Sequence, residues 1–196
     1  MTAKIKLNAA SGGGSFSLQA PSSSANNRVM TLPDSADGTI LTTTNPKAGN
    51  IIQVVTSSAS TGVSHGFSQN NFVDTGLSAS ITPSSSSNKI HVTGYLSYYV
   101  SLSGVGSAEW NFAICDGSNN ILDGATANTQ GYRFNQYYVL GGKHPINFLH
   151  SPNTTSSFTY KMRMNAKSAN QSGNLYCQIN ETGNNISRLT LMEVAG

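Results

Sequence analysis

From Asn50 onward, apolar and polar residues alternate along short segments of the chain. The clearest case is the segment 89–100, KIHVTGYLSYYV. Its even positions are mainly apolar and its odd positions are polar or aromatic, with Ile90, Val92, Leu96, Tyr98 and Val100 on one side and His91, Thr93, Tyr95, Ser97 and Tyr99 on the other. A period of two is that of a β-strand. The pattern predicts a strand with one face in the core and the other face polar or aromatic.

A second long segment, 156–167, follows the same rule. Tyr160, Met162 and Met164 alternate with Lys161 and Arg163, and Phe158 continues the apolar side. Further strands are expected at 50–56, 72–76, 77–82, 108–115, 132–140, 145–150, 174–179 and 186–194. About ten strands without a convincing helix favour an all-β fold, an antiparallel β-sandwich of jelly-roll type.

Connections between these strands are marked by Gly, Asn, Ser and Pro. The segment 115–120, CDGSNN, predicts a hairpin whose Asp-Gly pair supports a type I′ turn. Two other segments, 101–108 (SLSGVGSA) and 140–145 (LGGKHP), are expected to be loops.

The first 45 residues have a different pattern. Large apolar residues occur only in sparse pairs, such as Ile5 with Leu7 and Phe16 with Leu18, and Ser, Asn and Gly fill the space between them. So few apolar side chains cannot offset the conformational entropy of ordering the segment. We therefore expect an extended arm at 1–45, ordered within an assembly, followed by a β-sandwich head at 46–196.

The composition excludes several functions. Only 10% of the residues are charged, against about 25% in an average globular protein, and the net charge of +3 comes from scattered residues. Without a basic cluster we expect no nucleic-acid binding. No apolar run reaches the length of a membrane span, and no apolar segment follows the N-terminal lysines, so we expect neither membrane insertion nor a secretory signal.

Several segments carry a resemblance to a known group of proteins. The stretch 4–34, KIKLNAASGGGSFSLQAPSSSANNRVMTLPD, is followed by GTIL and then by GNIIQVV. This order resembles the N-terminal part of tail-fibre and related virion proteins of tailed phages, especially those of marine and cyanobacterial hosts. The stretch 72–92 and the terminal SRLTLMEVAG are similar to the β-rich C-terminal domain of the same proteins.

The resemblance implies a homotrimer with a virion-anchoring N-terminus and a C-terminal β-sandwich that touches the host surface. This chain passes almost directly from the arm to the β-domain without a long shaft. A short fibre, a fibre tip and a spike that decorates the capsid therefore all remain open.

Residues that could carry chemistry are few. Asp74, Glu109, Asp116 and Asp123 are scattered, and no pair has the arrangement of a glycosidase dyad, although distant carboxylates can meet in space. The four histidines, His65, His91, His144 and His150, lack a chelating spacing, although a trimer could bring three copies of one His to its axis. We expect no enzyme activity, no cofactor and no bound metal.

Cys115 and Cys177 are the only cysteines. The predicted strands place them on faces of different character, because Cys115 alternates with Asn111 and Ala113, whereas Cys177 alternates with Leu175 and Ile179. We therefore expect two reduced thiols rather than a disulfide, which suits assembly in a cytoplasm.

Two sets of residues are the candidate contact sites. The expected virion-anchoring and trimer contacts are the apolar residues of the arm: Phe16, Leu18, Met30 and Leu32. The candidate host-glycan contacts are tyrosines, which combine apolar area with a hydroxyl group: Tyr95, Tyr99, Tyr132, Tyr137 and Tyr138.

These observations favour a phage virion protein, a trimeric short tail fibre or spike. It would be synthesised in the host cytoplasm, attach to other virion proteins through residues 1–45, and contact a host-surface glycan with its head. One alternative is a capsid decoration or head-fibre protein that binds no receptor. A weaker alternative is a secreted lectin-like adhesin.

Overall fold

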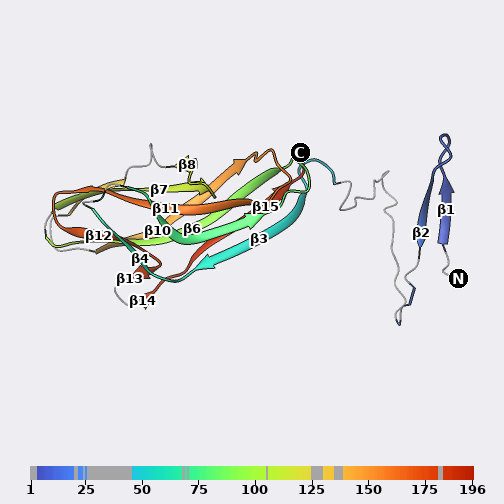
Figure 1. The fold of residues 1–196 in the computed structure, drawn as a ribbon. Coiled ribbons are helices and arrows are strands. Elements are labelled where there is room, and N and C mark those ends of the chain that lie inside the picture. Colours follow the sequence, from blue (N-terminus) through green and yellow to red (C-terminus); the bar gives the residue numbers. More distant parts are fainter. Residues whose placement is uncertain are drawn as a thin grey trace, which may run out of the picture. The chain divides into compact units, whose positions relative to one another are not determined.

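The structure is a computed structural model that describes residues 4–19, 22–23, 25, 46–67, 69, 71–104, 106–124, 130–134, 139–180 and 183–196. The chain forms two units, Met1–Ile40 and Leu41–Gly196. The described secondary structure consists of strands, and all strand pairs are antiparallel (Figure 1). None of the described segments is a helix long and apolar enough to cross a membrane.

The first unit contains a β-hairpin that the sequence pattern did not predict. Strands β1 (Lys4–Asn8) and β2 (Ser15–Gln19) pair so that Ile5 lies opposite Leu18 and Leu7 opposite Phe16. The backbone N–H of Ala9 donates to the carbonyl of Gly14 at 2.9 Å and closes the loop. Gly12 and Gly13 within this loop have φ angles of 84° and 70°, a region that favours glycine.

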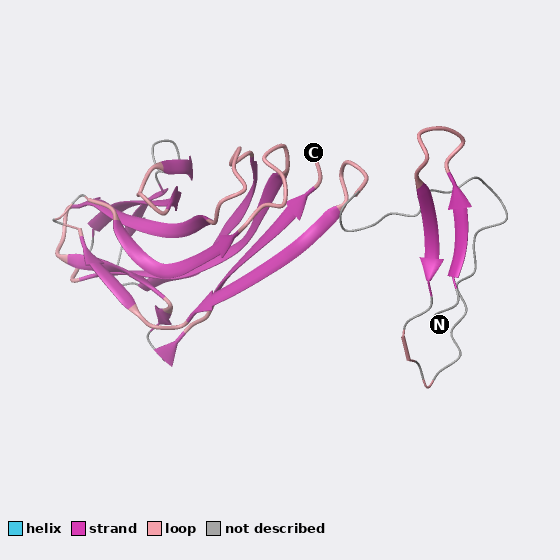
Figure 2. Cartoon of the chain, turned by 45° about the vertical axis from the view of Figure 1, so that its right-hand side comes forward, coloured by secondary structure: helices cyan, strands magenta, loops and turns pink. Residues whose placement is uncertain are grey.

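The second unit is an antiparallel β-sandwich, as the sequence predicts (Figure 2). Its first sheet contains β3 (Ile51–Ala59), β15 (Ser187–Val194), β6 (Lys89–Leu102), β12 (Gly173–Cys177), β4 (Val63–Gly66) and β10 (Val139–His150). Its second sheet contains β5 (Val73–Ile81), β11 (Phe158–Ala169), β7 (Gly106–Asp116), β8 (Ile121–Gly124) and β9 (Gln130–Phe134). A small pair, β13 (Ile179–Asn180) and β14 (Gly183–Asn184), follows β12.

Strand β6 organises the first sheet because it has partners along its whole length. One of its edges pairs with β15 along residues 89–95 and with β12 along residues 98–102. Its other edge pairs with β10 from Ile90 to Ser101. Segments that are far apart in the sequence thus become neighbours on one sheet.

The core lies between the two sheets and follows the predicted alternation. The predicted inner face of β6 is confirmed, since Ile90, Val92, Leu96 and Val100 are fully buried. The predicted inner face of β11 is confirmed too, because Tyr160, Met162 and Met164 are buried while Lys161 and Arg163 lie on the opposite side. Each fully buried side chain of this size contributes about 1.5–3 kcal/mol.

Several sequence predictions need correction. The predicted loop at 101–108 is shorter, because β6 ends at Leu102 and β7 begins at Gly106, and the predicted strand at 132–140 has its ends in two strands, β9 and β10. Segments 72–76 and 77–82 form one strand, β5, because a bulge at Gly76, with φ at 79°, lets the strand continue. The hydroxyl of Thr75 donates to the carbonyl of Met162 at 2.9 Å and accepts from the N–H of Leu77 at 3.3 Å, so side-chain bonds replace lost ladder bonds.

The turn at 115–120 is a hairpin, but not a type I′ turn. The N–H of Asp116 donates to the carbonyl of Asn120 and the N–H of Asn119 donates to that of Asp116, which leaves three residues in the loop. Asn119, rather than Gly117, has the positive φ of 72°. This is the geometry of a three-residue hairpin loop that ends in a left-handed residue.

The predicted loop at 140–145 is part of β10. Glycines and a proline led to the loop prediction, yet β10 is an edge strand, where proline is tolerated. A Cβ atom on Gly141 would lie 3.3 Å from the carbonyl oxygen of Tyr98 and 3.3 Å from Cβ of Tyr99, so glycine relieves crowding against β6.

Both cysteines are free and buried, and they lie on different sheets, Cys177 in β12 of the first sheet and Cys115 in β7 of the second. Cys177 belongs to the core, where its Sγ lies 3.2 Å from Sδ of Met164. Cys115 packs with Ala113 and Phe72 on the outer side. Burial raises the pKa of both thiols, which keeps them protonated.

Candidate functional site

The outer face of the first sheet carries two of the five tyrosines that the sequence singled out. Tyr95 and Tyr99 point away from the core because they occupy odd positions of β6, whose even positions are buried. Both side chains are half-buried among their neighbours on this face. Their Cα atoms are four positions apart along β6, which corresponds to about 13 Å along the strand. The two tyrosines therefore belong to different parts of the face.

Tyr99 forms a stack with Tyr176, a residue that the sequence analysis did not select. The two residues lie opposite each other on β6 and β12, and their rings are 4.4 Å apart with an interplanar angle of 4°. The side-chain amide of Asn174 donates to the hydroxyl of Tyr176 at 3.1 Å. The two rings lie face to face, so each covers one face of the other, and an amide lies beside them, which is a combination suited to sugars.

Tyr95 has a different environment. The ammonium of Lys143 on β10 lies 4.3 Å from the centre of the Tyr95 ring, a cation–π contact. Arg188 lies opposite Tyr95 on β15. Tyr95 therefore has cationic neighbours, whereas the Tyr99–Tyr176 stack lies beside the neutral amide of Asn174.

The remaining predicted residues lie in other strands or outside the described residues. Tyr132 lies in β9 of the second sheet. Tyr137 and Tyr138 lie outside the described residues, as do Met30 and Leu32 of the arm. Leu18 is 40% exposed in β2, where Phe16 is also placed.

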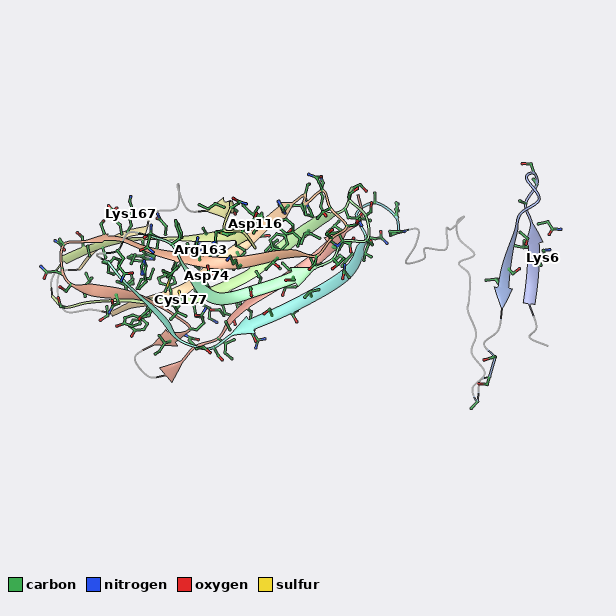
Figure 3. The ribbon with its side chains drawn as sticks, in the orientation of Figure 1. Lys6, Asp74, Asp116, Arg163, Lys167 and Cys177 are labelled. Carbon is green, nitrogen blue, oxygen red and sulfur yellow. The ribbon has the colours of Figure 1, made fainter. Side chains whose placement is uncertain are left out.

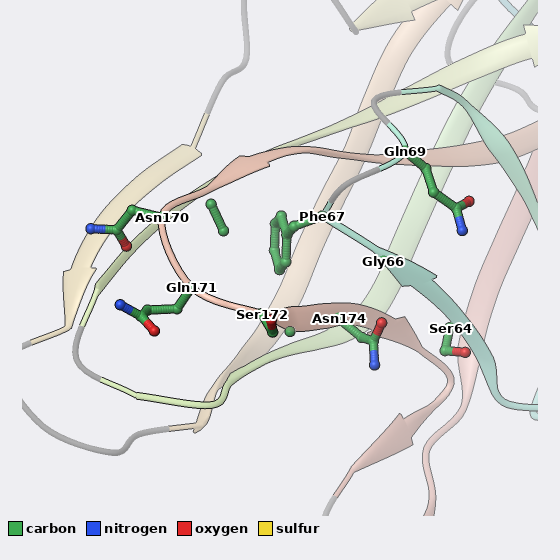
Figure 4. A pocket seen from close by; sticks show the side chains of 10 residues that line it. Ser64, Gly66, Phe67, Gln69, Asn170, Gln171, Ser172 and Asn174 are labelled. Carbon is green, nitrogen blue, oxygen red and sulfur yellow. The ribbon is translucent and has the colours of Figure 1, made fainter.

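A cleft of about 840 Å³ opens at one end of the outer face, beside the Tyr99–Tyr176 stack. It lies between β4 with the residues that follow it and the turn from β11 to β12 (Figure 4). Its lining residues are uncharged: Ser64, Gly66, Phe67, Gln69, Ala169, Asn170, Gln171, Ser172, Gly173 and Asn174. Asn174 belongs to both the cleft and the aromatic stack.

Backbone hydrogen bonds fix the walls of this cleft. Phe67 N–H donates to the carbonyl of Gly173 at 3.2 Å, and Ser103 N–H donates to that of Ser172 at 2.8 Å. The side-chain oxygen of Asn170 accepts from Ser107 N–H at 2.7 Å. The turn from β11 to β12 is thus hydrogen-bonded to Phe67 after β4 and to the segment 103–107 in the absence of a ligand.

Three of the acidic residues that the sequence singled out, Asp74, Glu109 and Asp116, are engaged in ion pairs or in a turn. Asp74 binds Lys161 at 3.1 Å and Arg163 at 2.7 Å on the outer side of the second sheet (Figure 3), and Glu109 binds Lys167 at 3.2 Å. Asp116 caps its own turn, where hydrogen bonds from Asn120 and Ser118 lower its pKa. Within the described part of the chain, no three His, Cys, Asp or Glu residues lie close enough together to hold a metal ion.

Two histidines of β10 lie on its inner side. The Nδ1 atom of His150 lies 2.8 Å from the hydroxyl of Tyr160, and the ring of His144 lies 4.9 Å from that of Phe112. Burial lowers the pKa of both histidines below 6.5, an effect that Asp123 opposes at His144 and Asp116 opposes at His150. The folded state therefore favours the neutral form of both imidazole rings.

This arrangement predicts a loss of stability in mild acid. A histidine whose pKa is lower in the folded state binds its proton more readily when unfolded, so stability falls as the pH drops below 6.5. Thermal unfolding from pH 7.5 to pH 5 should show a falling Tm. The variant His144→Leu/His150→Gln should have a flatter profile over this range, and an unchanged slope would contradict the assignment.

Comparisons with known proteins do not establish a family. No protein-family model matches the sequence, and no curated protein matches it. Similar chains occur among solved structures of infectious bursal disease virus. The chain in the structure of the Gt strain is 13% identical to this chain, with a TM-score of 0.36. The match covers 94% of this chain and 48% of the viral chain.

The D431N mutant VP2 protein of the same virus, in derived T=1 particles, has 15% identity and a TM-score of 0.38, over 96% of this chain and 44% of that chain. This chain thus spans less than half the length of these structures. At such identities and TM-scores, the likeness does not assign a function to this chain.

Proposed function

We propose that this chain is a structural protein of a virion, a short fibre or spike that is anchored by residues 1–45 and presents its β-sandwich head to the host surface. The sequence resemblance to tailed-phage fibre proteins supports this proposal at both ends of the chain. The division into a small N-terminal unit and a β-sandwich suits the same role.

The exposed apolar side of the N-terminal hairpin is the observation that carries the proposal. Ile5, Leu7 and Leu18 share one side of the β1–β2 pair and are 64%, 58% and 40% exposed. A two-stranded hairpin is at best marginally stable alone in water. Covering these side chains against a partner would stabilise the hairpin, since a fully buried Leu or Ile contributes about 1.5–3 kcal/mol.

In this proposal, partner copies in a homotrimer and a protein of the particle cover this apolar side of the hairpin. A trimer would also pair the strand edges that one copy leaves open. In this proposal the hairpin supplies assembly and anchoring, while the head supplies contact with the host.

The head is proposed to bind a host-surface glycan without cleaving it. Tyr99 and Tyr176 supply a stacked aromatic surface, and Asn174 supplies an amide beside it. The carboxylates described above are occupied by ion pairs or by a turn, which supports binding rather than hydrolysis.

A capsid decoration protein without a receptor is the second candidate. The observation that favours it is the contact of Lys143 with Tyr95, which occupies one of the aromatic rings proposed for the host. Binding of purified protein to host cells separates the two candidates.

The anchoring role predicts the outcome of a deletion. Light scattering should give three times 20.6 kDa for the full chain. The head alone, residues 46–196, should remain folded but lose both the trimer and incorporation into particles. The substitution Leu7→Ser/Leu18→Ser should weaken both properties in the intact chain. A stable full-length monomer at micromolar concentration, or normal incorporation of the truncated protein, would contradict the proposal.

A further inference from the structure

We propose that the cleft beside the Tyr99–Tyr176 stack binds a neutral sugar unit of a surface polysaccharide. This inference rests on the proposed glycan-binding function and deepens it, because it assigns both the place and the chemical class of the ligand. The cleft contains residues that the sequence analysis did not select, above all Gln69, Gln171 and Asn174.

The groups that line the cleft match a polyhydroxyl ligand. Gln69, Asn170 and Gln171 are exposed, so the amides of Gln69 and Gln171 and the amide N–H groups of Asn170 are open to solvent and to a ligand. Ser64 and Ser172 add hydroxyl groups. An amide both donates and accepts hydrogen bonds, as a sugar hydroxyl does. In Figure 4, Asn170 and Gln171 lie on one side of the Phe67 ring, and Gln69 and Asn174 lie on the other.

The aromatic surface lies next to this set of amides. Ser64 on β4 is directly opposite Tyr176 on β12, so the two side chains share the outer face. The amide of Asn174 lines the cleft and also donates to the Tyr176 hydroxyl at 3.1 Å. A sugar ring in the cleft can therefore bind amides while its apolar C–H side contacts Tyr176.

Charge determines the class of sugar. None of the ten lining residues is charged. Lys167 on the neighbouring part of β11 already binds the carboxylate of Glu109 at 3.2 Å. A uronic or sialic acid would lose the hydration of its carboxylate without gaining a cationic partner, so neutral hexoses and N-acetylhexosamines are favoured.

The backbone of the cleft is also held in place before a ligand enters. Hydrogen bonds from Phe67 to Gly173 and from Ser103 to Ser172 hold the backbone in place, and Phe67 is only 6% exposed beneath the polar groups. A site that is ordered before binding loses less conformational entropy when the ligand enters.

The test is a titration of the full-length protein with defined oligosaccharides, in which saturation-transfer NMR detects binding. The probes are neutral trisaccharides of hexoses and of N-acetylhexosamines with α and β linkages, and acidic trisaccharides of uronic and sialic acids. We expect binding of at least one neutral probe with Kd of the order of mM to tens of μM, and at least tenfold weaker binding of acidic probes.

Variants locate the site. Gln69→Ala, Gln171→Ala and Asn174→Ala should each weaken binding about threefold to tenfold, and Ser64→Trp, at an exposed strand position, should fill the cleft and abolish binding. Asn147→Ala is the matched control, because Asn147 lies on the same outer face of β10, outside the cleft, where it bonds to His91. The control should bind like the unchanged protein.

The outcomes separate this inference from the proposed function. If the protein binds host cells and the cleft variants bind equally well, the head contacts the host elsewhere and the inference is wrong. If only acidic probes bind, or if no neutral probe binds at 10 mM, roughly the weak limit of such sites, the assignment to neutral sugars is also wrong. If the protein never binds host cells while it still incorporates into particles, the glycan-binding function itself fails.

Discussion

Replacing Glu193 by Ala is expected to lower the free energy of unfolding of the head by about 3–5 kcal/mol. The side chain of Glu193 is fully buried at the end of β15. One carboxylate oxygen accepts from the backbone N–H of Ser84 at 2.6 Å, from the Ser84 hydroxyl at 2.8 Å and from the Asn88 amide at 2.6 Å. The other accepts from the Gln53 amide at 2.7 Å.

These bonds join three segments that are distant in the sequence. Gln53 belongs to β3, whereas Ser84 and Asn88 lie between β5 and β6. The side-chain oxygen of Asn88 also accepts from the backbone N–H of Gly196 at 3.1 Å. Removing the carboxylate leaves several donors without a partner in a buried place, which explains the size of the expected loss.

The pH dependence provides a second readout for Glu193. Burial raises the pKa of Glu193, but hydrogen bonds from Asn88, Gln53 and Ser84 outweigh this effect, and the pKa lies below 4.5. A carboxyl group with a lowered pKa in the folded state stabilises the protein at neutral pH, and that stability is lost as the pH falls below 4.5. Glu193→Gln should be less sensitive to pH in this window, which lies below that of the histidines.

Urea unfolding of the head at pH 7 measures the effect, with Glu109→Ala as the matched control. Glu109 forms an exposed pair with Lys167, so its removal should change the free energy of unfolding by less than about 1 kcal/mol. A loss as small as this for Glu193→Ala would show that the buried carboxylate does not hold these segments together.

The substitution Gly94→Ala is expected to destabilise the head by more than about 3 kcal/mol. Gly94 lies in the middle of β6, opposite Ile146 of β10 on one side and Leu189 of β15 on the other. A Cβ atom at this position would overlap the backbone carbonyl oxygen of Arg188. The crowding atoms are backbone atoms of Arg188 and Leu189 in the paired strand β15, so relief requires β6 and β15 to separate.

Gly142→Ala is the matched control in the neighbouring strand. A Cβ atom on Gly142 would lie 3.5 Å from the hydroxyl oxygen of Tyr98, an ordinary contact. Its substitution should change the free energy of unfolding by about 1 kcal/mol or less. Similar effects of the two substitutions on urea unfolding would argue against the close approach at Gly94.

Alternation of residue types was sufficient to predict the main strands and their buried faces. In β6 and β11 a period of two separates buried Val92 and Met162 from their less buried neighbours, and the structure confirms this alternation there. Local exceptions were harder to predict. The bulge at Gly76 and the turn at Asn119 depend on which residue takes the positive φ angle, a choice that neighbouring strands settle.

The candidate site was only partly predictable. Tyr99 could be placed on an outer face from its position in β6, but its stacking on Tyr176 depends on the pairing of β6 with β12, which are about 70 residues apart. The cleft combines residues 64–69 with residues 169–174. A single sequence does not indicate that these two segments lie side by side, and the polar run SANQSGN indicates only a turn.

The most direct test of the central claim is the location of this chain in an electron cryomicroscopy map of the particles made by cells that express it. The account predicts sets of three β-sandwich heads on the exterior, each connected to the particle through residues 1–45 and each with the Tyr176 face open to solvent. Particles that lack the chain, or heads whose Tyr176 face is covered by other virion proteins, would contradict it.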